Sequence, residues 1–317
     1  MMYLVIGSGS IGRRHFANLI SLGAEAELIS WRDEGNVGVT NRIVSLRKNV
    51  AVVICTATSI RRDIIDVCAA NNVPMYIEKP LAYRSPDLDH IYETVHPDLQ
   101  KRCLIGFMMR YHPIHAYIRS LGLENILRMI LQVGHDVTKW RQGWDFESSY
   151  AADSDGGGVL LDLCHEIDIA CTYMPEPRVM NAISIGHPAI KGVDILSCLN
   201  IGDAEGRFAH IEMDYLAPSL VRNGTIVSLN CLVEYDLVEG TVKTSSRDQV
   251  KIKKFRVDRN EMFLQIMADF IGLASCNEMV VSEHVPRMNV VKSTAYLIAD
   301  AWQRRDFVGV IARGAFP

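Results

Sequence analysis

The feature that most constrains the fold is a glycine-rich turn between a short apolar strand and a helix at the start of the chain. Tyr3 to Ile6 is apolar, Gly7-Ser-Gly-Ser-Ile-Gly12 follows at once, and a helical pattern runs from Arg13 to about Leu22. In a strand–turn–helix context, GxGxxG is typical of dinucleotide binding. Gly7 permits the tight turn, Gly9 lets the backbone approach a pyrophosphate, and Gly12 allows close helix–strand packing. The helix N-terminus supplies amide donors for phosphates. A glycine turn without a ligand is the alternative.

Further apolar segments extend this pattern into an α/β sheet. Residues 49–56 form an almost continuous apolar run, as expected of a parallel strand buried on both faces. A helix is expected over 59–71 and a strand over 73–77, with a last strand near 104–107. The strand over 73–77 delivers Glu78-Lys79-Pro80 to the carboxyl edge, where open α/β sheets bind ligands. The Lys79–Pro80 bond is a candidate cis peptide.

The end of the second strand bears on the choice of cofactor. The strand over 26–31 leads into Arg32 and Asp33, about where the ribose-reading residue belongs. Asp33 favours NAD because it can accept hydrogen bonds from a 2′-hydroxyl, whereas Ser30 and Arg32 suit the 2′-phosphate of NADP. The late position of the acid gives a slight preference for NADP. An ordinary charged loop is the alternative.

Composition excludes several classes of protein. The chain has 317 residues, is 49% hydrophobic and carries a net charge of −4, which suits a soluble protein of two domains. The weak acidity gives no reason to expect nucleic acid or anionic membrane as a partner. We expect no membrane span and no signal peptide. The eight cysteines show no CxxC spacing, which indicates reduced thiols in a cytoplasmic protein.

The second half predicts a different architecture. Its strand-like segments follow one another after a single helix, which suits an α+β domain with a large, mostly antiparallel open sheet. We expect domains at 1–120 and 121–317, with closing helices over 261–275 and 288–304. The expected strands cover residues 126–133, 181–185, 194–201, 207–215, 224–232, 237–244 and 249–255.

Between these strands lies Gly156-Gly-Gly-Val-Leu-Leu-Asp162-Leu-Cys-His165, read as three glycines running into one helix. At a spacing of three, Asp162 and His165 would share a helix face. A carboxylate beside an imidazole can fix its tautomer and raise its basicity, as proton abstraction requires. A structural pair is the alternative. The HExxH pattern is absent, so no metal is expected here.

Taken in order, three motifs resemble those of the Gfo/Idh/MocA oxidoreductases, the group of glucose-fructose oxidoreductase and inositol dehydrogenase. They are Gly7 to His15, Ile77-Glu-Lys79-Pro-Leu81 and Gly156 to Asp168. The resemblance implies a Rossmann domain, a substrate domain with an open sheet, and a sugar, cyclitol or sugar nucleotide lying between them.

The resemblance also implies roles for individual residues. Catalysis falls on Lys79, Asp162 and His165. Expected cofactor contacts are Gly7, Ser8, Gly9, Ser10, Ile11, Gly12, Arg32, Asp33, Thr56, Thr58 and Glu78, with Glu78 beside the nicotinamide. The Arg110-Tyr-His112-Pro113 and Trp140-Arg141 stretches resemble a branch associated with surface-carbohydrate biosynthesis, and Arg110, His112, Trp140 and Arg141 are expected to contact substrate. Relatives commonly form dimers or tetramers through the open sheet.

The chain departs from the family pattern at three places. Many relatives have a longer step between the acid and the histidine. The loop pattern TPTSxH reads Thr56-Ala-Thr-Ser-Ile-Arg61, and Met108 stands where relatives often carry a polar residue. The leading hypothesis is an NAD(P)-dependent oxidoreductase acting on a secondary alcohol. The alternatives are a dinucleotide-binding sensor without turnover, and NAD-dependent sugar hydrolysis or elimination through transient oxidation.

Overall fold

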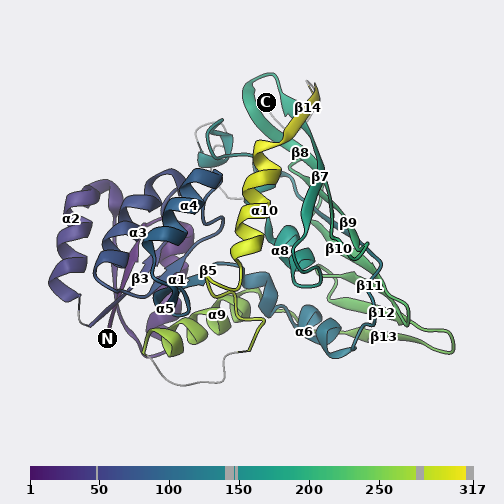
Figure 1. The fold of residues 1–317 in the computed structure, drawn as a ribbon, viewed down its shortest axis with the longest axis horizontal. Coiled ribbons are helices and arrows are strands. Elements are labelled where there is room, and N and C mark those ends of the chain that lie inside the picture. The colour runs from purple at the N-terminus through teal and green to yellow at the C-terminus, as the bar shows by residue number, and fades with distance from the viewer. Residues whose placement is uncertain (48, 140–145, 147–148, 276–281, 312–317) are drawn as a thin grey trace. The chain divides into compact units, whose positions relative to one another are not determined.

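The protein divides into two compact units (Figure 1). The computed structural model describes residues 1–47, 49–139, 146, 149–275 and 282–311. The first unit comprises Met1–Tyr111 and Asp258–Ala295, and the second comprises His112–Val257 and the chain from Tyr296 onward. The sequence predicts one boundary near residue 120, whereas the structure returns a later segment to the first unit.

The first unit is built on a five-stranded parallel sheet, in the order β2-β1-β3-β4-β5. Its strands are β1 (Met2–Ile6), β2 (Glu25–Ile29), β3 (Val50–Ile54), β4 (Met75–Ile77) and β5 (Leu104–Ile105). Because β1 lies between β2 and β3, the strand order reverses beside β1, and the loops after β1 and β3 are neighbours. Such a switch point is where doubly wound folds bind ligands. The predicted Rossmann-type architecture is confirmed.

Helices surround this sheet. They are α1 (Ser10–Ser21), α2 (Trp31–Leu46), α3 (Arg61–Ala70), α4 (Ser85–Thr94), α5 (Pro97–Gln100) and α9 (Arg259–Ala274), with short 3₁₀ turns η1 (Thr58–Ile60) and η2 (Met108–Tyr111). Helix α9 packs on α1, with the Arg14 guanidinium 5.0 Å from the Phe263 ring. Phe270 also meets Tyr3 of β1, with ring centroids 6.0 Å apart. These contacts explain why the segment after Val257 belongs to the first unit.

The end of β2 differs from its prediction. The strand stops at Ile29 and Ser30 is the residue before α2, so Arg32 and Asp33 occupy the first helical turn and are exposed. Two acidic residues in that turn, Asp33 and Glu34, favour a helix start because they face the positive end of the helix dipole.

The second unit is built on a nine-stranded sheet, counted over the described residues, in the order β13-β12-β11-β10-β6-β9-β8-β7-β14. Among the described strands of this sheet, only β6–β9 and β7–β14 pair in parallel, which confirms the mostly antiparallel sheet. The strands are β6 (Arg128–Gly134), β7 (Arg178–His187), β8 (Ile190–Gly202), β9 (Phe208–Asp214), β10 (Val221–Val227), β11 (Leu232–Asp236), β12 (Thr241–Ser245), β13 (Val250–Lys254) and β14 (Arg305–Val310).

Two predicted strands cross turns and are wrong in their limits. The segment 224–232 contains the turn between β10 and β11, where the Ser228 hydroxyl bonds the backbone carbonyl of Cys231 at 2.9 Å. The segment 237–244 contains the next turn, where Gly240 adopts φ = 69°. Apolar residues continue through both turns, so periodicity alone does not reveal them.

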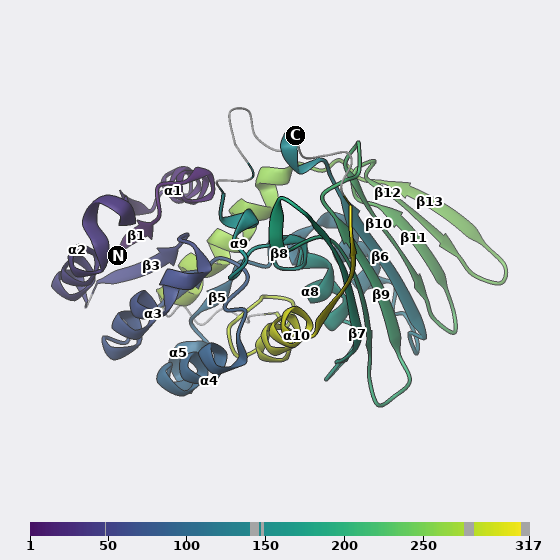
Figure 2. The ribbon, with the colours of Figure 1, turned by 90° about the horizontal axis from the view of Figure 1, so that it is seen from above.

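The two faces of the second sheet differ. Met129, Leu131, Leu199 and Ile211 are buried on the face that α7 (Val159–Asp162) and α8 (His165–Cys171) contact. The intervening residues, including Ile130, Gln132, His210 and Glu212, point the other way and are half-buried or exposed. We call this second surface the open face. Figure 2 shows α8 beside the sheet. The remaining helices are α6 (Pro113–Ser120) and α10 (Lys292–Gln303), with 3₁₀ turns η3 (Val137–Lys139) and η4 (Tyr150–Ala152).

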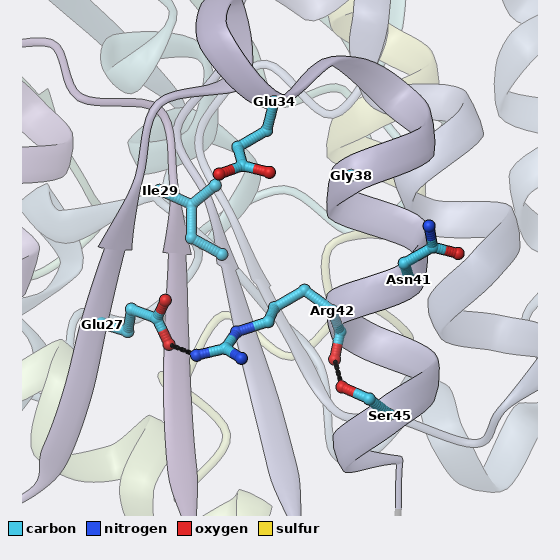
Figure 3. A pocket seen from close by; sticks show the side chains of 7 residues that line it. All are labelled: Glu27, Ile29, Glu34, Gly38, Asn41, Arg42 and Ser45. Carbon is cyan, nitrogen blue, oxygen red and sulfur yellow. Dashed lines mark hydrogen bonds and ion pairs between the residues drawn. The ribbon is translucent and has the colours of Figure 1, made fainter.

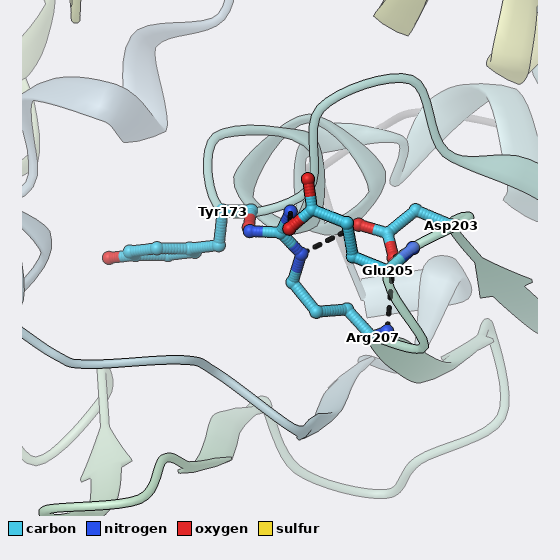
Figure 4. Close-up of polar contacts among 4 residues, drawn as sticks. All are labelled: Tyr173, Asp203, Glu205 and Arg207. Atoms are coloured by element: carbon cyan, nitrogen blue, oxygen red, sulfur yellow. Dashed lines mark hydrogen bonds and ion pairs between the residues drawn. The ribbon is translucent and has the colours of Figure 1, made fainter.

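The turn between β8 and β9 is organised by Asp203 (Figure 4). One carboxylate oxygen accepts from the backbone amides of Glu205 and Arg207, both at 3.0 Å, and the other accepts from Arg207 Nε at 2.7 Å. Arg207 also donates to the carbonyl of Tyr173 at 3.4 Å, which ties this turn to the segment after α8.

Among the described helices, none has both the length and the apolar character that crossing a membrane requires.

Candidate functional site

The glycine loop after β1 has the form that phosphate binding requires. Gly7 adopts φ = 114°, and a Cβ there would lie 2.8 Å from the Cys55 carbonyl oxygen. A Cβ on Gly12 would collide with the Gly7 carbonyl. Gly9 is different, because it has an ordinary φ of −68° and an added Cβ would meet no atom of the described residues within 4 Å. Packing within the chain therefore requires glycine at 7 and 12, while the space beside Gly9 is open to a ligand.

The start of α1 faces the same space. Gly9 is its N-cap and provides no side-chain hydrogen bond, so the first-turn amides are not capped by their own N-cap residue. The neighbouring loop, after β3, adds a buried hydroxyl. Thr56 is 8% exposed, and its Oγ1 has no hydrogen-bond partner among the described residues. A buried hydroxyl without a partner is costly, so a polar ligand atom here would be stabilising. These features fit a dinucleotide.

Arg61 explains one departure from the family pattern. Its buried guanidinium donates to the Thr56 carbonyl from Nε at 3.0 Å and from Nη2 at 2.8 Å. It also donates from Nη1 to the carbonyl oxygens of Glu78 and Pro80. The arginine, which stands where the resembled pattern has histidine, thus joins the loop after β3 to the loop after β4.

Lys79 lies between the two carbonyls that Arg61 holds. It is half-buried, follows Glu78 directly, and its peptide bond to Pro80 is cis, as expected from the sequence. The backbone on either side of this lysine is therefore fixed by a cation that belongs to the first unit. A charged side chain on a clamped loop is suited to a preorganised electrostatic role.

Glu78 is buried in a polar cluster. Its Oε1 lies 2.7 Å from His15 Nε2 and accepts from the Tyr76 hydroxyl at 3.2 Å. Burial raises the pKa of the Glu78 carboxyl, but the hydrogen bond and charge of His15 and the charges of Lys79 and Arg61 outweigh it, so the pKa is lowered. Glu78 is consequently a fixed negative charge beside Lys79.

In the second unit, the predicted single helix through Asp162 and His165 is wrong. Helix α7 ends at Asp162 and α8 begins at His165, because Leu163 and Cys164 have ψ angles of 22° and 2°. Each short helix is anchored separately, α7 through Asp162 and α8 through Glu166, and the backbone turns between these anchors. The two site residues remain at adjacent helix ends, although the shared-face argument no longer applies.

Asp162 is held by two tyrosines. Its Oδ1 accepts from the Tyr150 hydroxyl at 3.2 Å, and its Oδ2 accepts from the Tyr215 hydroxyl at 3.0 Å. Tyr215 is fully buried, and its pKa is raised well above the usual value by burial and by the negative charge of Asp162. Tyr215 therefore stays protonated and acts as a donor. Nothing in the sequence separates these tyrosines from the other nine.

The start of α7 is tied to the sheet by Asp194. Its Oδ2 accepts from the Leu160 amide at 2.9 Å and from the Ser197 hydroxyl at 2.7 Å, while its Oδ1 pairs with Arg305. Gly158 adopts φ = 99°, and a Cβ there would collide with the Asp194 carboxylate. The last glycine of the Gly156 run is thus required by close approach to a buried ion pair.

Helix α8 is anchored by an ion pair between Glu166 and Arg222 of β10. Arg222 Nε lies 2.6 Å from one carboxylate oxygen, and Nη2 lies 2.9 Å from the other. Such a bidentate pair fixes orientation as well as distance. It accounts for the glutamate beside His165, and His165 itself is buried at the first position of the helix.

Of the four residues predicted to contact substrate, the structure describes Arg110 and His112. Arg110 is buried in η2, and its Nη1 donates to the carbonyl of His284 at 3.5 Å. His112 caps α6, and its Nδ1 accepts from the Ile114 amide at 3.2 Å. Burial, and then the charge of Arg222, lowers the pKa of His112 to about 4, so this imidazole is neutral. Trp140 and Arg141 lie outside the described residues.

A hollow between β2 and α2 is separate from these residues (Figure 3). It is lined by Glu27, Ile29, Glu34, Gly38, Asn41, Arg42 and Ser45. Arg42 already pairs with Glu27 at 2.5 Å, and Ser45 donates to the Arg42 carbonyl at 2.8 Å. The hollow includes none of the predicted site residues, and we assign it no function.

Comparison with known proteins supports the fold and the motifs. No protein-family model matches the chain. It is 25% identical over 227 residues to scyllo-inositol 2-dehydrogenase (NAD(+)) of Bacillus subtilis strain 168, a match that covers 66% of this chain and 63% of that protein.

Similar solved structures cover nearly the whole chain, and two of them illustrate the likeness. UDP-N-acetylglucosamine 3-dehydrogenase from Acidithiobacillus ferrooxidans has a TM-score of 0.74 at 16% identity, covering 96% of this chain and 97% of that one. A 3-ketoreductase from Actinomadura kijaniata, determined with NADP, has a TM-score of 0.76 at 16% identity, covering 98% and 99%. The chain therefore shares its two-part fold with these proteins, and its ordered motifs resemble those of the Gfo/Idh/MocA oxidoreductases.

Proposed function

We propose that the protein is an NAD(P)-dependent dehydrogenase or reductase, which transfers a hydride between nicotinamide and a secondary carbon of a sugar, cyclitol or sugar nucleotide. The observation that carries this proposal is the glycine loop at the switch point. Gly9 leaves room that the chain itself does not use, beside the start of α1 and the unsatisfied hydroxyl of Thr56. The same fold places Lys79 at the carboxyl edge of this sheet.

The cofactor would be held mainly by the first unit. The backbone of Gly7, Ser8, Gly9, Ser10, Ile11 and Gly12 would bind the pyrophosphate, with Thr56 and Thr58 beside it and Glu78 toward the nicotinamide. When bound, the nicotinamide accepts or donates the hydride. Glu78 and Thr56 lie on adjacent strand ends, which Arg61 holds together.

The protein's own part is to move a proton and to stabilise charge. His165 takes the proton from the substrate hydroxyl during oxidation and returns it during reduction. Lys79 donates a hydrogen bond to the same oxygen and stabilises the negative charge that develops on it. Asp162, fixed by Tyr150 and Tyr215, orients the substrate or His165. The proposal requires Lys79 and His165, which belong to different units, to reach one oxygen atom.

The preferred cofactor is proposed to be NADP. Arg32 and Asp33 are both exposed in the first turn of α2, where Arg32 can reach a 2′-phosphate and Asp33 a 2′-hydroxyl. Measured dissociation constants for NADPH and NADH decide this point. Arg32→Ala should weaken NADPH binding and leave NADH binding nearly unchanged. Equal effects on both cofactors would contradict a role for Arg32 at the 2′-position.

The substrate class is proposed from the resemblance and the relatives. The names of the relatives refer to a cyclitol, a sugar nucleotide and a 3-keto group. In this chain, Arg110, His112, Trp140 and Arg141 are the proposed substrate contacts. An arginine among them suits a carboxylate or phosphate on the substrate.

A substrate screen monitored by NAD(P)H fluorescence tests the proposal against its alternatives. The protein would be incubated with NAD or NADP and a panel of sugars, cyclitols and sugar nucleotides. A dehydrogenase accumulates reduced cofactor with at least one compound. A sensor binds the cofactor without turnover, and transient oxidation releases a cleaved sugar without net NAD(P)H.

A homodimer or homotetramer formed through the open face is part of the proposal. Large apolar side chains are exposed on its strands, including Ile130, Ile183 and Phe208. Light scattering of the purified protein tests this, and a monomer at micromolar concentration would contradict it. We also propose a cytoplasmic location, which fractionation of the source cells would test.

A further inference from the structure

Three potential metal ligands gather on the open face of the second unit. Cys198 lies on β8, and His210 and Glu212 lie on β9. Their ligand atoms all lie within 4.8 Å of one another. Strand pairing brings them together, because Cys198 is opposite Glu212 and Asn200 is opposite His210. All three are half-buried in the single chain, so an ion can reach the cluster before the open face is covered by another copy.

The hydrogen bonds fix the orientation of His210. Asn200 donates its side-chain amide to Asn181 Oδ1 at 2.8 Å, so it presents its carbonyl oxygen to His210 Nδ1, also at 2.8 Å. The Nδ1 atom must therefore carry the proton. The other ring nitrogen, Nε2, then lies only 3.1 Å from Glu212 Oε1. Two acceptors at this distance repel unless a cation or a proton lies between them.

Glu212 is also held in place. Its Oε2 accepts from the Gln132 side-chain amide at 3.3 Å, which leaves Oε1 directed toward His210. A histidine that donates its second N–H to a carbonyl and a carboxylate that is itself hydrogen-bonded are typical surroundings of metal ligands. The cluster therefore has outer contacts as well as three donor atoms.

We propose that Cys198 Sγ, His210 Nε2 and Glu212 Oε1 bind a divalent cation of the zinc class, with water in the fourth position. Thiolate, imidazole and carboxylate together favour Zn²⁺ over Mg²⁺ or Ca²⁺, which prefer oxygen ligands alone. Tetrahedral zinc places its ligand atoms about 3.5 Å apart, so small side-chain rotations close the present spacing. On binding, the Cys198 S–H bond breaks, its proton leaves to solvent, and a sulfur–metal bond forms.

The local charges favour a cation. The carboxylates of Glu212 and Asp214 place negative charge near the Cys198 sulfur. Those carboxylates disfavour a bare thiolate but attract a divalent ion that neutralises it. The proposed site shares no residue with the hydride-transfer proposal, so either one can fail without the other.

Cobalt titration tests the site directly. The reduced full-length chain is freed of metals with EDTA, and Co²⁺ is added while the absorption spectrum is recorded. We expect a near-ultraviolet thiolate-to-cobalt band and visible bands of a four-coordinate ion, saturating at one Co²⁺ per chain and lost on addition of Zn²⁺.

Variants locate the ligands. Cys198→Ser should remove the thiolate band, and His210→Ala should prevent the titration from saturating. Cys231→Ser, a matched change at another half-buried cysteine, should leave the titration unchanged. Asn200→Ala should keep the band and weaken cobalt binding about 10–100-fold, because Asn200 only orients His210. If Asn200 served only the fold of the sheet, Asn200→Ala would leave the cobalt affinity unchanged.

Several results would overturn the proposal. They are a wild-type spectrum that Co²⁺ does not change, and a Cys198→Ser or His210→Ala spectrum that matches wild type. Zn²⁺ should also raise the thermal midpoint of wild type and of Cys231→Ser, but not that of Glu212→Gln. Glu212 is half-exposed, so this variant still decides the question if Cys198→Ser folds poorly.

Discussion

At the scale of single residues, the structure changes how Asp162 and His165 are understood. They lie at the end of α7 and the start of α8, and the carboxylate of Asp162 accepts hydrogen bonds from two tyrosine hydroxyls. Asp162 is thus a fixed, hydrogen-bonded charge. Lys79 has a comparable setting in the first unit, because Arg61 holds the backbone carbonyls on both sides of it.

Lys79→Met should lower turnover by about 10²–10³-fold, because a preorganised donor to the reacting oxygen is lost. Cofactor binding should be unchanged, since Lys79 is not among the groups that hold the pyrophosphate. Steady-state kinetics and NAD(P)H titration measure the two effects. Lys101→Met, at an exposed lysine paired with Asp98, is the control and should match wild type. Normal turnover in Lys79→Met would remove this lysine from the mechanism.

Tyr215→Phe should lower the free energy of unfolding by about 1.5–3 kcal/mol, because a buried hydrogen bond to a carboxylate is lost. Urea denaturation measures this. In an Asp162→Asn background the same change should cost less, since the partner's charge is gone. Equal costs in both backgrounds would show that the Tyr215 hydroxyl does not act through the charge of Asp162.

At the scale of elements, periodicity and glycine placement predict some features well and others poorly. The strand–loop–helix at Gly7 to Gly12 is predictable because each step has a local sequence signal. The break between α7 and α8 is not, because it depends on Tyr215 and Arg222, more than fifty residues away. The same limit applies to Asp194 and to Cys198–His210–Glu212, whose side chains meet only through strand pairing. The strand limits predicted near Ser228 and Gly240 are wrong because apolar residues continue through the turns.

Arg61→Met should lower the free energy of unfolding by about 3 kcal/mol or more, because the buried carbonyls of Thr56, Glu78 and Pro80 lose their donor. Denaturant unfolding provides the measurement. Arg62→Met, at the exposed neighbouring position with a 3.5 Å contact to Asp87, should stay within about 0.5 kcal/mol of wild type. Similar losses in both variants would mean that Arg61 does not join the two loops.

Asp194→Ala should lower the free energy of unfolding by about 3–5 kcal/mol. Arg305 is then left as a buried charge without its partner, and α7 loses its link to the sheet. Asp300→Ala removes an exposed partner of Arg304 and should cost at most about 1 kcal/mol. Thermal or denaturant unfolding distinguishes the two. A small loss in Asp194→Ala would contradict the anchoring role.

At the scale of the whole molecule, each unit carries part of the proposed chemistry. The parallel sheet provides the cofactor loop, Thr56, Glu78 and Lys79, and the second unit provides Asp162 and His165. The fold of both sheets is shared with similar solved structures, and the order of the three motifs along the chain is what made that fold predictable.

Global stability should fall as pH decreases from about 6.5 to 4. His112 is neutral in the folded protein down to its pKa of about 4, whereas in the unfolded chain it takes up a proton near 6.5. The unfolded state therefore binds more protons in this window, and the stability present above pH 6.5 is lost as pH falls. A shift of about 2.5 pKa units corresponds to roughly 3 kcal/mol. Burial also lowers the pKa of His115, which adds in the same direction.

Unfolding curves recorded at pH values from about 7.5 to about 4 measure how the free energy of unfolding depends on pH. His112→Asn retains an acceptor suited to the N-cap position. It should reduce the stability lost as pH falls through this window by roughly 3 kcal/mol. His96→Asn makes the same change at an exposed capping histidine and should leave the slope unchanged. An unchanged slope in His112→Asn would contradict the assignment.

The central claim is hydride transfer between nicotinamide and a sugar carbon, and isotope transfer tests it most directly. A substrate found in the fluorescence screen would be deuterated at the carbon to be oxidised and incubated with NAD(P) and the protein. Mass spectrometry should find deuterium on the nicotinamide ring, in an amount equal to the ketone formed, and Lys79→Met and His165→Ala should both slow its appearance by about 10²–10³-fold. Oxidised product without deuterium in the cofactor, or a cleaved sugar with the cofactor returned unchanged, would contradict the account.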